Sequence, residues 1–223
     1  MKCIALIHTV KGLANSFEGM LRKEIEEEIK VQNLWDDFLA DNPNEIGEFT
    51  IENRCRLLMD MKTQEMTGAD MIVTTCSTLT PVVEMIRPFM KIPVIAIDDA
   101  MAKKAAVSGE KIMVLATAES TVEPTVSKIQ TEAQRAERKI QIEHRVCMEA
   151  FRAMKQMDME RHDRLLKEMA GALSGYDCIV LAQASMSHLE KEIRDITGIE
   201  TLSSPRLCME EIKKKLEEIN YDR

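Results

Sequence analysis

The sequence predicts an α/β fold with two pseudo-symmetric lobes, each a four-stranded parallel sheet flanked by helices. Three observations support this prediction. Short runs rich in β-branched residues alternate with amphipathic helical stretches, which is typical of βαβ units. The same order of elements occurs twice along the chain. Polar residues recur where the strands should end, and in a parallel sheet these ends share one edge.

Eight strands are expected, four in each half of the chain. They cover Cys3–Ile7, Val31–Trp35, Met71–Thr75 and Pro93–Ile97 in the first half, and Ile112–Ala116, Ile140–Glu143, Cys178–Ala182 and Glu200–Ser203 in the second. Helices are expected near residues 14–30, 45–68, 80–90, 119–137, 147–174, 187–197 and 206–220. The stretches 45–68 and 147–174 hold matching places, each before the third strand of its half.

The spacing of charged residues indicates an internal repeat. Lys2 and Lys111 open the first strand of each half, and Asp70 and Asp177 precede the third, at nearly equal separations. The boundary is expected in the segment DDAMAKKAAVSGEK, which begins after Ile97. The first lobe would then comprise residues 1–98 plus 205–223, with the final helix packing back on it, and the second lobe residues 99–204.

Composition excludes several classes of function. The chain has 223 residues, 45% of them hydrophobic, and 30 basic against 38 acidic residues give a net charge of −8. Scattered basic residues in an acidic chain argue against nucleic-acid binding. No apolar stretch approaches the roughly 20 residues of a membrane span, and no signal-peptide pattern is present, so a cytoplasmic location without membrane partners is expected. The apolar helices leave room for a homodimer.

The six cysteines are widely spaced, with no C-x-x-C pair and no histidines at zinc-ligand spacing. Free thiols are therefore expected, with no metal site. Cys3, Cys147 and Cys178 lie among apolar neighbours, where a cysteine usually packs as a small hydrophobe. Cys76 differs, because it follows a predicted strand at a helix start, where free N–H groups favour a thiolate.

Small hydroxyl side chains gather at the predicted strand ends. Ligands of open parallel sheets bind there, and hydroxyl groups suit a carboxylate because they donate hydrogen bonds without bulk. The first half places there His8, Thr9, Thr75, Cys76, Ser77, Thr78, Asp98 and Asp99; the second half places there Thr117, Ser120, Thr121, Gln183, Ala184, Ser185 and Ser204.

Simpler interpretations exist for several of these residues. Ser77, Thr78 and Ser185 are expected as helix caps on the same evidence, and capping is compatible with ligand binding. Asp98 and Asp99 are explained equally well as caps of a helix starting near Ala100. His8 is explained equally well as a satisfied surface residue.

Four segments resemble the aspartate/glutamate/hydantoin racemase superfamily. They are IALIHT at the N-terminus, ADMIVTTCSTL (69–79), VLATAESTVEPT opening the second half, and IVLAQASM late in it. The resemblance spans nearly the whole chain. It implies two similar α/β lobes with the active site between them, and cofactor-independent chemistry at a carbon next to a carboxylate, in which two thiols alternate as base and acid.

The resemblance also assigns residues. Cys76 corresponds to the first thiol, Ser77 and Thr78 to carboxylate binders, Thr117 and Thr121 to their second-half counterparts, and His8 and Thr9 to the loop after the first strand. The second thiol is replaced by Gln183. A glutamine amide neither gains nor loses a proton near neutrality, although it can hydrogen-bond a developing enolate oxygen. Cys178 is too early in its strand to substitute.

Three functions remain open. The first is isomerisation, with Cys76 on one face of the substrate and His8, or a water it positions, on the other. The second is a lyase in which Cys76 alone protonates a carbanion, as in single-cysteine relatives that are decarboxylases. The third is a non-catalytic carboxylate-binding protein. Since no Arg or Lys lies at the strand ends, the expected substrate is a small amino or dicarboxylic acid.

Overall fold

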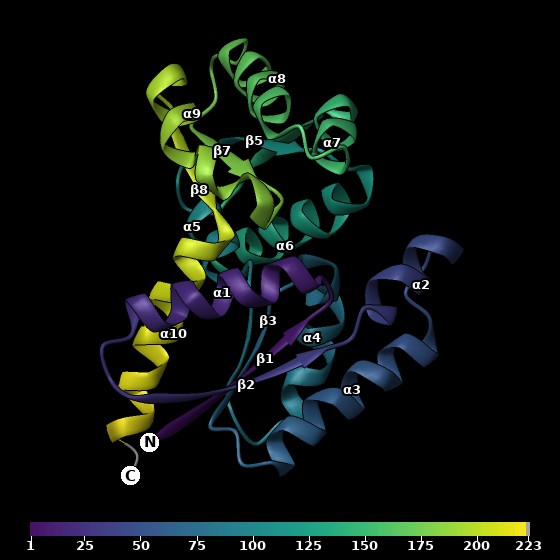
Figure 1. Cartoon of the computed structure of the whole chain (residues 1–223). Helices are drawn as coiled ribbons and strands as arrows, with labels where there is room; N and C mark the ends of the chain where they lie inside the picture. Colours follow the sequence, from purple (N-terminus) through teal and green to yellow (C-terminus); the bar gives the residue numbers. More distant parts are fainter. Residues whose placement is uncertain (222–223) are drawn as a thin grey trace. The chain divides into compact units, whose positions relative to one another are not determined.

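The chain folds into two separate four-stranded parallel sheets, as predicted (Figure 1). The computed structural model describes residues 1–221. The first sheet contains β1 (Lys2–His8), β2 (Ile29–Trp35), β3 (Met71–Thr74) and β4 (Val94–Ala96), in the order β2-β1-β3-β4. The second contains β5 (Lys111–Ala116), β6 (Gln141–Val146), β7 (Cys178–Leu181) and β8 (Glu200–Ser203), in the equivalent order β6-β5-β7-β8.

The chain divides into two compact units, one around each sheet. The first unit comprises Met1–Ile97 together with the chain from Cys208 onward, and the second comprises Asp98–Leu207.

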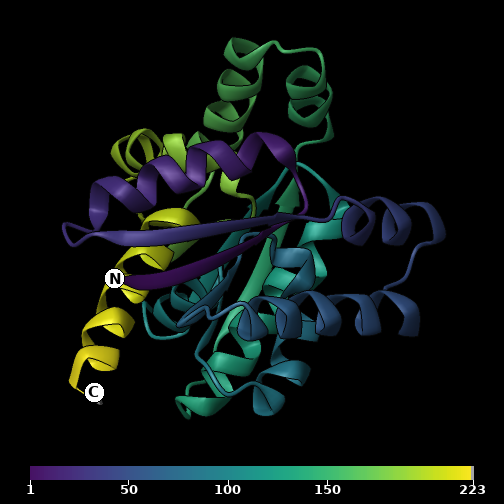
Figure 2. The same ribbon diagram turned by 60° about the horizontal axis from the view of Figure 1, so that its bottom comes forward.

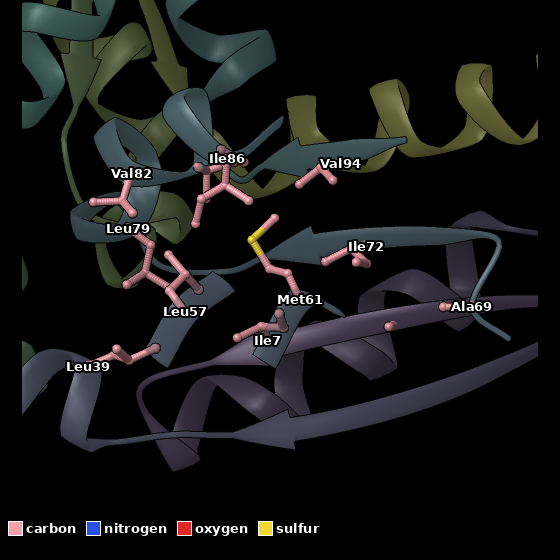
Figure 3. Packing of buried hydrophobic residues seen from close by; sticks show 13 residues of the cluster. Ile7, Leu39, Leu57, Met61, Ala69, Ile72, Leu79, Val82, Ile86 and Val94 are labelled. Carbon is pink, nitrogen blue, oxygen red and sulfur yellow. The ribbon is translucent and has the colours of Figure 1, made fainter. Parts of the chain in front are cut away.

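In the first unit both faces of the sheet are covered, so every residue of β1 is buried. Ala5 and Ile7 point to the face where Leu57 and Met61 of α3 pack (Figure 3). Because side chains alternate along a strand, Ile4 and Leu6 point to the opposite face. Helix α1 packs against β1 and β2 and runs beside them in both ribbon views (Figure 2).

In the second unit the same alternation divides the core into two clusters. Ile112, Val114 and Ala116 pack with residues of α5 and α6. Met113 and Leu115 pack with residues of α7, α8 and α9 on the other face. Each fully buried aliphatic side chain of this kind contributes about 2 kcal/mol to the free energy of unfolding.

The helices connect successive strands and depart from the predicted ranges in three places. They are α1 (Lys11–Glu24), α2 (Phe38–Ile46), α3 (Ile51–Met66), α4 (Thr80–Ile86), α5 (Asp99–Ala105), α6 (Val122–Arg135), α7 (Met148–Lys155), α8 (Met159–Gly171), α9 (Glu190–Thr197) and α10 (Ser204–Tyr221). Short 3₁₀ turns are η1 (Ser77–Leu79), η2 (Arg87–Phe89), η3 (Glu119–Thr121) and η4 (Ala184–Leu189). Among residues 1–221, no helix combines the length and apolar character needed to cross a membrane.

The predicted helix 14–30 is too long, because the backbone is already extended at Ile25. The predicted helix 45–68 corresponds to α3 and begins too early, because Gly47, with φ of 82°, ends the preceding helix α2. The predicted helix 147–174 is two helices. Met157, with φ of 61°, ends the first, and the Asp158 side chain caps the second by accepting from Arg161 N–H (3.0 Å).

The repeat extends to individual hydrogen bonds. Asp70, just before β3, accepts from the backbone N–H of Cys3 (2.8 Å). Asp177, just before β7, accepts from the backbone N–H groups of Glu110 (2.8 Å) and Lys111 (2.9 Å). Each aspartate therefore ties the start of the third strand to the start of the first in its own sheet.

Candidate active site

The carboxyl edge of the first sheet brings together three of the predicted residues, His8, Thr75 and Cys76. His8 ends β1, and Thr75 and Cys76 follow β3, the strand paired directly with β1. The Thr75 hydroxyl lies 2.8 Å from His8 Nδ1. The sheet register thus places an imidazole beside the residue that precedes the thiol.

Cys76 is half-buried and occupies the cap position before η1. Its backbone is extended (φ −128°, ψ 121°), and the chain turns immediately afterwards. Ser77 and Thr78 are partly exposed on this turn. The alternative prediction that they cap the helix is wrong, since the cap positions of η1 and α4 belong to Cys76 and Leu79 and neither carries a side-chain cap.

His8 is fully buried, and both of its ring nitrogens have partners. Burial lowers the pKa of His8, while the hydrogen bond to Asn33 and the charge of Glu18 oppose that shift. Nε2 lies 3.0 Å from Asn33 Oδ1, and the Asn33 amide donates in turn to Glu18. Because Asn33 Oδ1 only accepts, Nε2 carries a proton, and Nδ1 faces the Thr75 hydroxyl, which also lies 3.3 Å from Ile7 O.

Two further polar features lie at this edge. Thr9 is buried, and its hydroxyl has no hydrogen-bond partner within residues 1–221. Asp36 follows β2, donates its backbone N–H to His8 O (2.8 Å), and forms an ion pair with Arg56 of α3. Burial and the neighbouring Asp36 carboxylate raise the pKa of Asp60, also on α3, to about 7.

The Asp36, Arg56 and Asp60 group was not predicted from the sequence. Asp36 does stand directly after a predicted strand, so its position at a strand end was a signal for it in the sequence. No local signal indicates that two residues of α3 join it.

The carboxyl edge of the second sheet brings together Thr117 and Gln183. Thr117 follows β5 and is fully buried, and Gln183 follows β7 and is half-buried. The Thr117 N–H donates to Gln183 Oε1 (2.7 Å), and Gln183 Nε2 donates to the Thr117 hydroxyl (2.8 Å). This pair of hydrogen bonds fixes the orientation of the amide and leaves one Nε2 hydrogen and the Thr117 hydroxyl hydrogen as donors.

The remaining predicted residues of the second unit lie on the turns after β5 and β7. The Thr121 hydroxyl donates to Ala118 O (2.8 Å) within η3, and Ser120 is exposed on the same turn. Ala184 and Ser185 begin η4, and Ser185 is exposed. Ser185 is not a cap, because Gln183 takes the cap position of η4 and carries no side-chain cap bond.

Asp98, Asp99 and Ser204 are buried. Asp98 takes the cap position of α5 without a side-chain cap bond, and Asp99 forms an ion pair with Lys128 of α6 (2.7 Å). Asp98 therefore stands at the predicted cap position without bonding through its side chain, whereas Asp99 lies inside α5 and holds it against α6.

The six cysteines are free thiols, as predicted. Cys178 begins β7 with no exposed surface, and burial raises its pKa to about 12. It lies at the opposite end of β7 from Gln183 and is unsuited to proton transfer near neutral pH. Cys147 directly follows β6 and is buried in the apolar cluster with Ala150 and Leu166.

Comparison with known proteins decides the family. Residues 43–212 match the family described as Asp/Glu/hydantoin racemase. The chain belongs to this family. The matched range includes Cys76, Thr117 and Gln183, whereas His8 and Thr9 precede it. At the level of the family, the protein is a racemase-type enzyme.

Solved structures of racemases share the fold. The chain is similar to an aspartate racemase from Picrophilus torridus, with 18% identity, a TM-score of 0.69, and coverage of 96% of this chain and 94% of that one. It is also similar to glutamate racemase RacE1 from Bacillus anthracis, with 15% identity, a TM-score of 0.70, and coverage of 97% and 82%.

An allantoin racemase from Klebsiella pneumoniae is a third similar structure, with 14% identity, a TM-score of 0.63, and coverage of 97% and 88%. No curated protein matches the chain in sequence. At these identities the structures show that the fold is shared, which confirms the predicted architecture.

Proposed function

We propose that the protein is a cofactor-independent isomerase that acts at the carbon α to the carboxylate of a small amino or dicarboxylic acid, with Cys76 as acid/base. The observation that carries this proposal is the half-buried thiol of Cys76 at the carboxyl end of β3, on a chain that belongs to a racemase family. A thiolate there would remove the α-proton from one face of the substrate, and inversion then requires a proton delivered to the opposite face of the carbanion.

Hydroxyl groups beside Cys76 support binding of the substrate carboxylate. Ser77 and Thr78 follow it on a tight turn, with side chains that are partly exposed. The buried Thr9 hydroxyl has no hydrogen-bond partner among the described residues, so it gains a bond when an anion binds close by. These groups add no net charge, which favours a small acid over a polyanion.

His8 is the proposed source of the second proton, and its contacts limit how it would act. Both ring nitrogens are engaged, and Nδ1 is bonded to the Thr75 hydroxyl. A proton exchanged between His8 and a substrate would therefore pass through the Thr75 hydroxyl or require that bond to open. The same contacts give His8 a positioning role, because they fix the Thr75 side chain next to Cys76.

Gln183 is proposed as a hydrogen-bond donor to a carboxylate at the edge of the second sheet. Thr117 holds its amide by two hydrogen bonds, so the remaining Nε2 hydrogen has a fixed direction. A preoriented donor stabilises negative charge that develops on a carboxylate during enolisation. The amide does not transfer protons, which distinguishes its role from that of a thiol.

The replacement of the second thiol by Gln183 favours a lyase as the second candidate function. In a decarboxylation, the bond between the α-carbon and a carboxylate breaks, carbon dioxide leaves with the carboxylate oxygens, and the electron pair stays on the α-carbon. One proton from Cys76 then completes the product. This reaction needs a single acid/base, and the partly exposed thiol of Cys76 can fill that role.

An exchange experiment in deuterium oxide tests both candidates. The unaltered protein is incubated with single enantiomers of small amino acids and dicarboxylic acids, and the α-position is followed by NMR and chiral chromatography. Deuterium entry with inversion supports the isomerase. Consumption of a disubstituted malonate with release of carbon dioxide supports the lyase.

A third result would contradict both proposals. If acids bind, as measured by calorimetry, with neither exchange nor consumption, and the Cys76→Ala variant binds them equally well, the protein is a carboxylate-binding member of the family. The Cys55→Ala variant, which removes an exposed thiol of α3, serves as the control for non-specific effects of thiol loss.

A further inference from the structure

Three ionisable side chains outside the proposed active site meet in the second unit. His162 and Asp163 lie near the start of α8, and His188 lies in η4. His162 Nδ1 lies 2.7 Å from Asp163 Oδ1, and His188 Nε2 lies 2.9 Å from the same oxygen. Two imidazoles thus present one nitrogen each to a single carboxylate oxygen.

The arrangement is compact enough to hold one ion. The three ligand atoms, two nitrogens and one oxygen, all lie within 4.8 Å of one another. The imidazole rings are stacked, with centroids 6.2 Å apart and planes inclined by 25°.

Burial is graded across the group. The His162 side chain has no exposed surface, and its Nε2 has no hydrogen-bond partner within residues 1–221. Its one polar contact is therefore made by the nitrogen that faces Asp163. The side chains of Asp163 and His188 are 24% and 45% exposed, so an ion can enter from solvent.

One carboxylate oxygen of Asp163 faces a nitrogen of each imidazole. The nearby cation Lys167 is itself paired with Glu192 (2.9 Å). A negative ligand between two imidazoles suits a divalent cation.

We propose that His162, Asp163 and His188 form a binding site for a divalent transition-metal ion of the zinc class. Zinc accepts both imidazole nitrogens and carboxylate oxygens, and three protein ligands leave a position open for water. Tetrahedral zinc needs its ligand atoms about 3.3 Å apart. The nitrogen–oxygen separations of 2.7 and 2.9 Å would each lengthen by about half an ångström, and the two nitrogens, now within 4.8 Å, would settle about 3.3 Å apart. The partly exposed side chains of Asp163 and His188 have room for these movements.

Metal binding would join two elements of the second unit. His188 lies near the end of η4, the turn that begins at Ala184 directly after Gln183. An ion shared with α8 would fix this turn in place. The metal site does not depend on the proposed isomerase activity, and the experiment below reads binding alone.

The site is tested with Co²⁺ and Zn²⁺ on the full-length chain. Cys55 is exposed and Cys76 half-buried, so the parent protein for this experiment carries Cys55→Ser and Cys76→Ser to remove competing thiols. Co²⁺ is added and its d–d absorption recorded, Zn²⁺ is used to displace it, and Zn²⁺ affinity is measured by calorimetry. His144→Ala, which removes an exposed histidine of β6, is the matched control.

We expect one equivalent of Co²⁺ to give visible d–d bands that Zn²⁺ abolishes, with a rise in the unfolding temperature of the parent protein. His188→Ala should weaken Zn²⁺ binding by more than about 100-fold, Asp163→Asn by at least about tenfold, and His144→Ala not at all. The proposal is overturned if the parent binds no metal, or if His188→Ala binds it as tightly as the parent.

Discussion

The two sheets share a frame but differ in what stands at their carboxyl edges. Both have the same strand order, and in both an aspartate ties the third strand to the first. The first edge carries ionisable groups, His8 and Cys76. The second carries an amide and a hydroxyl, Gln183 and Thr117, bonded to each other. We therefore propose proton transfer at the first edge and hydrogen bonding to a carboxylate at the second.

The neighbouring strands show the same contrast. Asp36 after β2 donates its N–H to His8 O, and Cys147 after β6 donates its N–H to Ala116 O, both at 2.8 Å. The backbone contact is equivalent in the two units, but Asp36 is an ion-paired carboxylate and Cys147 is part of an apolar cluster. The repeat thus preserves backbone geometry while side-chain chemistry diverges.

The largest effect is expected from giving the second edge a thiol. The Gln183→Cys change supplies a second acid/base at the strand end equivalent to that of Cys76, and we expect the rate of inversion to rise by about 100-fold. The matched control is Gln183→Ala, which loses the same two hydrogen bonds to Thr117 without gaining a thiol. Chiral chromatography measures the inversion rate, and equal rates in the two variants would break the proposed equivalence of the strand ends.

A smaller effect, on protein stability, is expected from a change beside Asp177, the aspartate that ties β7 to β5. Gly109 has φ of 156°, and a Cβ added there would lie 2.2 Å from Asp177 Cβ. Gly109→Ala should lower the free energy of unfolding by about 2–3 kcal/mol, because either the backbone or the Asp177 contacts must shift.

The control for this prediction is Gly19→Ala, in the middle of α1, where an added Cβ meets no atom within 4 Å. That change should stabilise the protein by up to about 1 kcal/mol. Urea unfolding measures both values, and a neutral Gly109→Ala would show that the aspartate tie in the second unit is loose.

The smallest effect is on the pH dependence of stability, and it comes from the Asp60 carboxyl group beside Asp36. Because the pKa of Asp60 is raised to about 7, the folded state binds more protons than the unfolded state between about pH 4 and pH 7. Stability therefore falls as pH rises through this window. Asp60→Asn removes the effect, so the variant should exceed the unaltered protein by about 1 kcal/mol at pH 8, after allowance for solvent screening, and by almost nothing at pH 4.

Urea unfolding at the two pH values measures the difference. Asp195→Asn, at an exposed position of α9, is the control and should show no such pH dependence. An advantage of Asp60→Asn that is equal at pH 4 and pH 8 would contradict a protonated carboxyl at this position.

The strands were predictable because their signal is local. Runs such as CIALI and MIVTT are apolar and β-branched, and a sheet covered on both faces requires such runs. Helix breaks were not predictable in the same way. The apolar periodicity continues across Gly47 and Met157, and nothing in the sequence around Met157 indicates a positive φ.

Polar residues that directly follow a predicted strand are expected at the carboxyl edge of the sheet, and this expectation identified Cys76, His8, Thr117 and Gln183. Their hydrogen-bond partners depend on the sheet register and on residues far away in sequence. Asn33 reaches His8 because Leu6 and His8 pair with Asn33 and Trp35 across the sheet. His162 and His188 meet only after α8 and η4 are packed, so their spacing in the sequence carries no metal-site signal. Single-residue patterns do not encode such contacts.

The central claim is that one thiol, Cys76, moves the proton. Its most direct test is the first-order rate of deuterium entry at the α-carbon of a turned-over acid, measured for the unaltered protein, for Cys76→Ala and for Cys55→Ala. We expect Cys76→Ala to lower this rate by about 1,000-fold and Cys55→Ala to leave it unchanged. Equal rates with and without the Cys76 thiol would contradict the account.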